Sequence, residues 1–234
     1  MLDPAPCLLV IIFATLASTR VEDNLGQAQI RLYSAPKSFR AETEFKLALA
    51  ALHSFEYPLA LVHFENVIRL ERDFLLGYWG AAMSCWQPVW MSSDSSSARI
   101  FLQRAPKEAF GKNSAYSILL YNATVALFSP SSGKENIDVE AYLHLMRFAV
   151  VKFPTDVESK AFLALGILAK ILPEFRGFVD RGSILLPELN IHLNAGLKLS
   201  PNHPGLFWCA SMTVFLPSIR HFFFSFPYMF SRNI

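Results

Sequence analysis

Apolar residues recur every three or four positions in several short segments of this chain, and each segment ends near a proline, a glycine or a charged pair. The first stripe consists of Phe45, Leu49 and Leu52 and follows Ser38, a residue type that often caps a helix. Residues with this spacing lie on one face of an α-helix. A short helix cannot bury such a face alone, so the helices must pack against one another. The pattern therefore predicts an all-α chain of antiparallel helix pairs.

The same criteria predict a succession of helices along the chain. Pro58 is placed at a helix start, where its missing N–H costs no hydrogen bond. No alternating pattern of useful length predicts a strand before residue 205. Loops are expected at 92–97 and 129–136, and a break is expected at 173–182. Further helices are expected at 57–68, 74–85, 98–110 with an interruption near Pro106, 115–128, 139–151, 157–172 and 186–199.

The first residues of the chain are typical of a secretory signal. Cys7 to Leu16 is an apolar run, and Thr15 and Ala17 supply the small residues three positions and one position before a cleavage site. Residues 1–18 are therefore predicted to be a signal peptide, and 19–37 a linker. The alternative is an uncleaved apolar N-terminal helix. Secretion makes the sequon at Asn122 a candidate glycosylation site.

Cys7 would leave with the signal peptide, and the two remaining cysteines, Cys85 and Cys209, do not make a disulfide framework. Cys85 lies on an apolar stripe and is expected to be a buried thiol.

Residues 206–234 differ abruptly from the helical-repeat region predicted for 38–205. This tail is rich in phenylalanine, contains Pro217 and Pro227, and has no acidic residue. We interpret it as an aberrant sequence that follows a truncated repeat domain. The alternative is a membrane anchor, but the apolar run from Leu206 to Ile219 is 14 residues, shorter than the ~20 that a bilayer requires. The predicted location is the secretory pathway or outside the cell, with membrane association as the alternative.

The helix pairs resemble tetratricopeptide repeats, in which a small residue is followed by an aromatic residue, an alanine and a proline at fixed offsets. Ala60 and Phe64 match this pattern, and Ala149 and Pro154 match it in a later pair. The repeats are irregular, because Pro154 and Pro201 are 47 residues apart rather than the usual ~34. The resemblance implies an α-solenoid of stacked helix pairs.

A narrower resemblance is to a family of tetratricopeptide-repeat proteins of bacteria and some animals. It is carried by three segments: Ala51–Tyr57, with the sequence ALHSFEY; Tyr78–Met83, with the sequence YWGAAM; and Asn202–Gly205, with the sequence NHPG. The match covers roughly residues 40–205. It implies the helical repeat fold and no particular biochemical activity.

Four aromatic residues are candidates for a partner groove: Tyr57, Trp79, Trp86 and Trp90. Large aromatic side chains can line a groove for a peptide or an apolar ligand. The alternative is core packing, which is the commoner role of aromatic residues in helical stripes.

Six histidines raise the question of a metal site. His53 and His63 lie on different predicted helices and could approach one another, whereas His203 could join them only by a long return of the chain. Glu140 and His144 form an i, i+4 pair suited to a solvated surface. No metal-ligand spacing on one helix face, nucleophile motif, phosphate loop or dinucleotide fingerprint is present. No catalytic residue, cofactor or metal ligand is therefore predicted.

These observations favour a secreted scaffold, rather than an enzyme, that binds a protein or peptide partner. The net charge of +2 gives no electrostatic footprint for nucleic acid, and a membrane becomes a partner only if the C-terminal tail is genuine. The alternative function is a histidine-dependent metal-binding hydrolase or oxidase that uses His53, His63 and residues missing from a truncated chain.

The truncation hypothesis is tested by sequencing the native transcript across the codons for residues 195–234. We expect the frame to continue from Asn202–Gly205 into further helical repeats. A confirmed stop codon after Ile234 would contradict this expectation and make the aromatic tail genuine.

Overall fold

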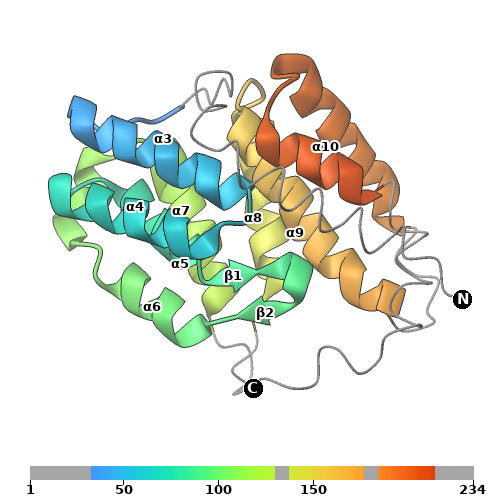
Figure 1. Ribbon diagram of the computed structural model, residues 1–234, viewed down its shortest axis with the longest axis horizontal. Helices are drawn as coiled ribbons and strands as arrows, with labels where there is room; N and C mark the ends of the chain where they lie inside the picture. Colours follow the sequence, from blue (N-terminus) through green and yellow to red (C-terminus); the bar gives the residue numbers. More distant parts are fainter. Residues whose placement is uncertain (1–32, 130–136, 177–183, 214–234) are drawn as a thin grey trace, which may run out of the picture.

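The computed structural model describes residues 33–129, 137–176 and 184–213, and this part of the chain is helical apart from one very short ladder (Figure 1). The elements are α3 (Phe39–His53), α4 (Tyr57–Leu70), α5 (Leu75–Met83), β1 (Trp86–Gln87), η1 (Pro88–Trp90), β2 (Ser92–Ser93), α6 (Ser95–Gln103), η2 (Lys107–Lys112), α7 (Ala115–Phe128), α8 (Val139–Lys152), α9 (Val157–Arg176) and α10 (Leu186–Leu199). A last helical segment at 204–213 follows α10. The all-α prediction is confirmed at this level.

Helix starts follow the capping residues in the sequence. Ser38 caps α3, where its hydroxyl accepts a hydrogen bond from the Ala41 N–H at 3.2 Å. Asp138 does the same for α8, with 2.9 Å from its carboxylate to the Ala141 nitrogen. Pro58 lies in the first turn of α4, as predicted. These local side-chain acceptors satisfy N–H groups that a helix cannot pair internally.

The predicted helix at 98–110 is wrong in its limits. Asp94 accepts a hydrogen bond from the Ser97 N–H at 3.0 Å, so α6 already begins at Ser95 inside the predicted loop. The helix ends at Gln103, and a 3₁₀ helix follows Pro106. Before α6, β1 and β2 pair antiparallel, with Trp86 opposite Ser93. Two-residue strands are too short for alternation to reveal them.

Helices that are adjacent in the chain pack against one another. α3 packs on α4, α4 on α5, α7 on α8, α8 on α9, and α9 on α10, and α5 also contacts both α6 and α7. Figure 1 shows α3 and α4 side by side, with α9 and α10 forming the other side of the molecule. This is the neighbour pattern that helix pairs produce. A regular superhelical repeat remains a prediction.

Glycines set two of the closest helix approaches. A Cβ atom added at Gly80 of α5 would overlap the buried ring of Phe64 on α4. A Cβ atom at Gly166 of α9 would lie 2.9 Å from Tyr142 and Leu143 of α8. Phe64 and Tyr142 therefore fill their positions only because the facing helix carries no side chain there.

The predicted signal peptide and most of the 19–37 linker lie outside the described residues, as does the tail beyond residue 213. The described start of the tail belongs to the core, because Leu206 and Cys209 are both buried in it. Among the described helices, none combines the length and apolarity needed to cross a bilayer.

Replacing Gly80 with alanine tests the close approach of α4 and α5. We expect Gly80→Ala to lower the free energy of unfolding by about 1–3 kcal/mol, because the core ring of Phe64 must move. Gly111→Ala is the matched control, since a Cβ atom there meets no atom within 4 Å. Urea denaturation of both variants measures the difference. Equal stabilities would show that α5 can shift away from Phe64 at little cost.

Candidate functional site

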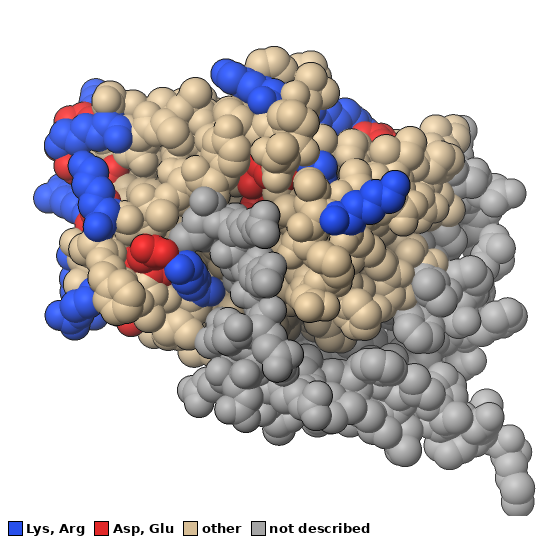
Figure 2. Space-filling view, turned by 90° about the horizontal axis from the view of Figure 1, so that it is seen from above, with Lys and Arg blue, Asp and Glu red and all other residues tan. Residues whose placement is uncertain are grey.

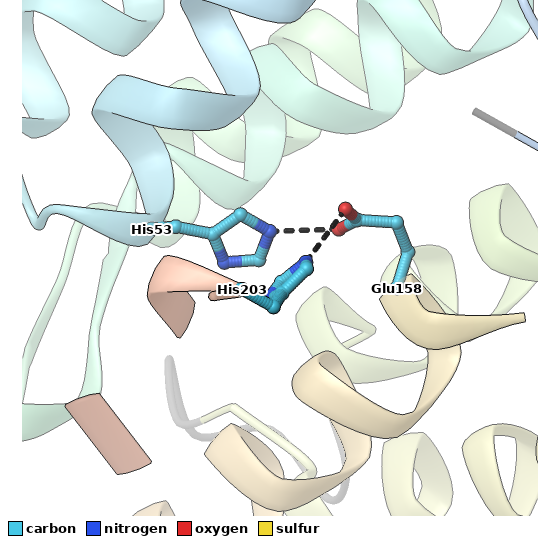
Figure 3. A group of neighbouring side chains, drawn as sticks. All are labelled: His53, Glu158 and His203. Carbon is cyan, nitrogen blue, oxygen red and sulfur yellow. Dashed lines mark hydrogen bonds and ion pairs between the residues drawn. The ribbon is translucent and has the colours of Figure 1, made fainter. Parts of the chain in front are cut away.

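Three buried titratable side chains meet in the interior: His53, Glu158 and His203 (Figure 3). The Nε2 atom of His53 lies 2.7 Å from one carboxylate oxygen of Glu158. The Nε2 atom of His203 lies 2.9 Å from the other oxygen. The exposed fractions of His53, Glu158 and His203 are 5%, 4% and 0%. We call this group the buried cluster.

Each member of the buried cluster comes from the end of a different helix. His53 is the last residue of α3, Glu158 lies in the first turn of α9, and His203 immediately precedes the helical segment at 204–213. The positive end of the α9 dipole favours the carboxylate, and the negative end of the α3 dipole favours a proton on His53. The cluster therefore joins three helix termini, and at α3 and α9 the backbone dipole suits the group carried there.

The proton positions follow from the hydrogen bonds. The Nδ1 atom of His203 accepts the Leu206 N–H at 3.3 Å, which caps the next helix. A neutral ring that accepts at Nδ1 carries its proton on Nε2, so Nε2 of His203 donates to Glu158. The same carboxylate accepts from Nε2 of His53. Glu158 is thus an ionised acceptor held between two imidazole donors.

The environment shifts the pKa values of two of these groups, Glu158 and His53. Burial alone would raise the pKa of Glu158, but the two histidines, through charge and hydrogen bonding, hold it well below its ordinary value. Burial lowers the pKa of His53; His203 lowers it further, and Glu158 opposes both effects. A carboxylate that stays ionised beside a predominantly neutral ring leaves negative charge inside the protein.

Close packing fixes the His53 ring. It lies 4.7 Å from the His203 ring and 5.0 Å from Phe162, measured between ring centroids. A Cβ atom at Gly205 would overlap the ring nitrogen Nδ1 of His53. Only glycine at position 205 leaves room for His53 in this position, which gives the NHPG segment a physical role.

The chemistry of the buried cluster is that of a metal-ligand set or of an ion-paired link between helices. One donor atom from each residue lies within 4.8 Å of the other two. Imidazole nitrogen and carboxylate oxygen are both common ligands of zinc and similar divalent ions. The burial of all three groups leaves no room for a substrate at the cluster.

Sequence reasoning found only part of this cluster. His53 is in it, but His63 instead pairs with Glu44 at 2.8 Å, outside the core. His203 does lie beside His53, because the chain makes the long return that this contact requires. The sequence did not predict Glu158 as a member of the cluster. Its signal was a carboxylate in the first turn of a largely apolar helix. Glu140 of the proposed surface pair contacts Lys170 at 2.9 Å.

The four predicted groove residues occupy two kinds of environment. Trp79 and Trp86 are buried, Trp79 against Phe162 and Trp86 against Tyr142. Tyr57 is also buried, but its ring lies 5.9 Å from that of Trp90, which is 50% exposed. The structure thus separates the core tryptophans from a surface aromatic group around Trp90.

A pocket of about 530 Å³ is lined by residues around η1 and by residues of α8 and α9, and Trp90 is not among them. Trp86, Pro88 and Met91 form its wall on the η1 side. The α8 and α9 side contributes Val139, Glu140, Ala169 and Lys170. Of the predicted groove residues, only Trp86 therefore lines this pocket, whereas the ring of Trp90 packs against Phe55 and Tyr57, which do not line it.

The remaining predicted sites are also located. Asn122 is exposed on α7, although the hydroxyl of Thr124 is buried and donates to the Leu120 carbonyl at 3.2 Å. Cys85 is a buried free thiol, as predicted, and so is Cys209. Burial raises the pKa of each thiol to about 12, which makes both unreactive.

No family model, curated protein or solved structure matches this chain. The resemblance to tetratricopeptide-repeat proteins therefore stays a prediction, and the arguments about function that follow depend on the described residues themselves.

The buried cluster predicts acid lability. His53 and Glu158 both have folded pKa values below their ordinary values of 6.5 and 4.5, so the unfolded chain binds more protons at acid pH. Their stabilisation is complete above these ordinary values and is lost as the pH falls, first for His53 below about 6.5 and then for Glu158.

We expect the free energy of unfolding, measured by urea denaturation in the presence of a chelator, to fall between pH 7 and pH 5. His53→Gln retains an N–H donor without a titrating ring, so its loss over this interval should be smaller. If the free energy of unfolding of this variant falls as steeply between pH 7 and pH 5 as that of the original chain, His53 is not the cause of the acid lability.

Proposed function

We propose that this chain is a secreted helical scaffold of the tetratricopeptide-like kind, and that it binds an apolar segment of a protein or peptide partner at the surface around Trp90. The single observation that carries this proposal is the half-exposed ring of Trp90, which packs against the aromatic rings of Phe55 and Tyr57. A partly exposed tryptophan that packs on other aromatic side chains is typical of an interaction hot spot.

The support of Trp90 is extensive. The ring of Phe55 lies 5.7 Å from it in an edge-on arrangement, and that of Tyr57 lies 5.9 Å from it. Phe55 in turn contacts Trp208, from the segment at 204–213, at 5.5 Å. Edge-on pairs of this kind are favourable beyond the area that they bury. Three separate parts of the chain therefore hold the aromatic surface in place.

The backbone around this surface is strained. Phe55 and Met91 are the two non-glycine residues with positive φ among the described residues, at 63° and 53°. Phe55 follows the C-cap of α3, where Phe55 and Glu56 donate to the Leu52 and Ala51 carbonyls. Glycine usually occupies this position, and a side chain there costs roughly 1–2 kcal/mol. Strain of this kind gathers at functional surfaces.

The charge distribution supports a protein partner over nucleic acid. Figure 2 shows a face on which, over its described part, Lys and Arg side chains lie among Asp and Glu near one end, without a continuous basic patch. The pocket between the η1 region and α8 and α9 has both Glu140 and Lys170 in its lining. Binding there would depend on apolar contacts rather than on a strong electrostatic field.

The alternative, a histidine-dependent metal enzyme, has less support. His53 and His63 do not form a common site, since their partners are Glu158 and Glu44. The residues that line the pocket between the η1 region and α8 and α9 include no histidine. A hydrolase or oxidase needs substrate access to its metal, and the burial of His53 and His203 works against such access.

A peptide-display selection on the full chain tests the proposal. We expect enriched peptides with an aromatic or aliphatic anchor, because the surface around Trp90 offers apolar contacts. Trp90→Ala should weaken the affinity of such a peptide about 10-fold or more, the loss expected for a hot-spot tryptophan. Fluorescence anisotropy of labelled peptides measures this affinity.

Phe148→Ala is the matched control, since Phe148 on α8 is 53% exposed and lies outside the aromatic surface. It should leave the affinity unchanged. Peptides that bind Trp90→Ala as tightly as the original chain would place the binding surface elsewhere, and a selection without enrichment would remove the support for peptide binding.

A further inference from the structure

We propose that His53, Glu158 and His203 bind one divalent transition-metal ion of the zinc type, and that this ion has a structural role in joining α3, α9 and the segment at 204–213. The site is independent of partner binding at Trp90. Nothing in the sequence spacing marks it, because its ligands are separated by 105 and 45 residues.

The donor atoms are already assembled. Both histidines present Nε2 to the same carboxylate, and the three donor atoms lie within 4.8 Å of one another. Ligands of a zinc ion lie about 2.0–2.2 Å from the metal, so two donors around one ion are at most about 4.4 Å apart. Small movements of three side chains would therefore admit the ion, with no rearrangement of the helices.

The charge of the cluster favours a cation. A buried carboxylate is costly unless positive charge compensates it. Within the described part of the chain, the ion-pair partners of Glu158 are His53 and His203, and no lysine or arginine lies within ion-pair distance of it. Neutral imidazoles offer hydrogen bonds but no full charge. A divalent ion would supply that charge and use the same donors.

The closed surroundings specify a structural site. The side chains of His53 and Glu158 are each 5% exposed, and that of His203 is 1% exposed. A structural zinc ion usually has four ligands, so a water molecule or the second oxygen of Glu158 would have to complete the three that the cluster supplies, but burial of this degree works against the substrate access that a catalytic site needs. The ion would connect three helix termini that lie far apart in the sequence, so its binding energy would add directly to folding stability.

Metal binding makes a specific demand on His203. Coordination through Nε2 moves the ring proton to Nδ1. Nδ1 could then no longer accept the Leu206 N–H, which it now does at 3.3 Å. Occupation of the site should therefore loosen the amide of Leu206 while it stabilises the molecule as a whole. A hydrogen-bonded cluster without metal would not show these opposite effects.

The chain contains a natural comparison for this site. His63 and Glu44 form a partly buried pair at 2.8 Å, and Asn66 donates to the same Glu44 oxygen at 2.9 Å. This pair has one imidazole and one carboxylate but no second histidine. It should bind zinc much more weakly, so it controls for general effects of a histidine–glutamate pair.

The first experiment titrates the full chain, freed of metal by a chelator, with Co²⁺ and then with competing Zn²⁺. We expect one equivalent of Co²⁺ to bind and to give the visible absorption of nitrogen and oxygen coordination, which Zn²⁺ then removes. The midpoint of thermal unfolding should rise with Zn²⁺ concentration. Hydrogen exchange should show faster exchange at Leu206 in the zinc form.

Glu158→Gln and His203→Gln should weaken Zn²⁺ binding more than about 10-fold, since each removes one of three ligands. Glu44→Gln and His63→Gln should leave it unchanged. Circular dichroism before titration identifies any variant that has not folded, and the titration of the unaltered chain is informative without the variants.

Failure of the folded, unaltered chain to bind Co²⁺ or Zn²⁺ at stoichiometric concentration would overturn the proposal. An equal loss of Zn²⁺ affinity in the cluster variants and in the His63 and Glu44 variants would also overturn the proposal. Trp90→Ala should bind metal normally, so a failure of the peptide-binding proposal leaves this test intact.

Discussion

The carboxylate of Glu158 is the group on which the arrangement of the described helices most depends. It lies between two imidazoles, and both belong to segments that the chain could not bring together by local packing. The contacts between neighbouring helices determine each pair, but they do not determine how α3 is placed relative to the segment at 204–213. That relation depends on His53, Gly205 and Glu158. Glu158 is a buried charge that is hydrogen-bonded to His53, and a Cβ atom at position 205 would overlap the His53 ring.

The sequence predicted the local structure well, because local structure depends on local physics. The start of α3 after Ser38 and the start of α4 near Pro58 follow from capping and from the fixed φ of proline. The limits of α6 were missed because Asp94, in a serine-rich stretch that resembles a loop, acts as a cap. The convergence of His53 with His203 could not be derived, since no residue near either one records a contact 150 residues away along the chain.

The aromatic residues illustrate the same limit. Closeness in the sequence identified Trp79, Trp86 and Trp90 as a group, but it cannot separate a core ring from a surface ring. Trp79 enters the core because it packs on Phe162 of α9, whereas Trp90 lies on a single turn of 3₁₀ helix after Pro88 and stays half exposed. Phe55 contacts Trp90, and Met91 follows it in the chain. The pattern of apolar residues does not reveal their positive φ angles, and neither residue is a glycine that would have indicated such a conformation.

The 45-residue separation between Glu158 and His203 has a consequence for biosynthesis. A ribosome that adds about 5–20 residues per second needs roughly 2–9 seconds to proceed from the glutamate to the second histidine. During that interval α3 and the start of α9 can meet, but the carboxylate has one imidazole partner and the space later filled by Leu206 is open. The nascent chain thus passes through a stage in which the Glu158 carboxylate lacks one of its two hydrogen-bond donors, and it leaves that stage only when the NHPG segment emerges.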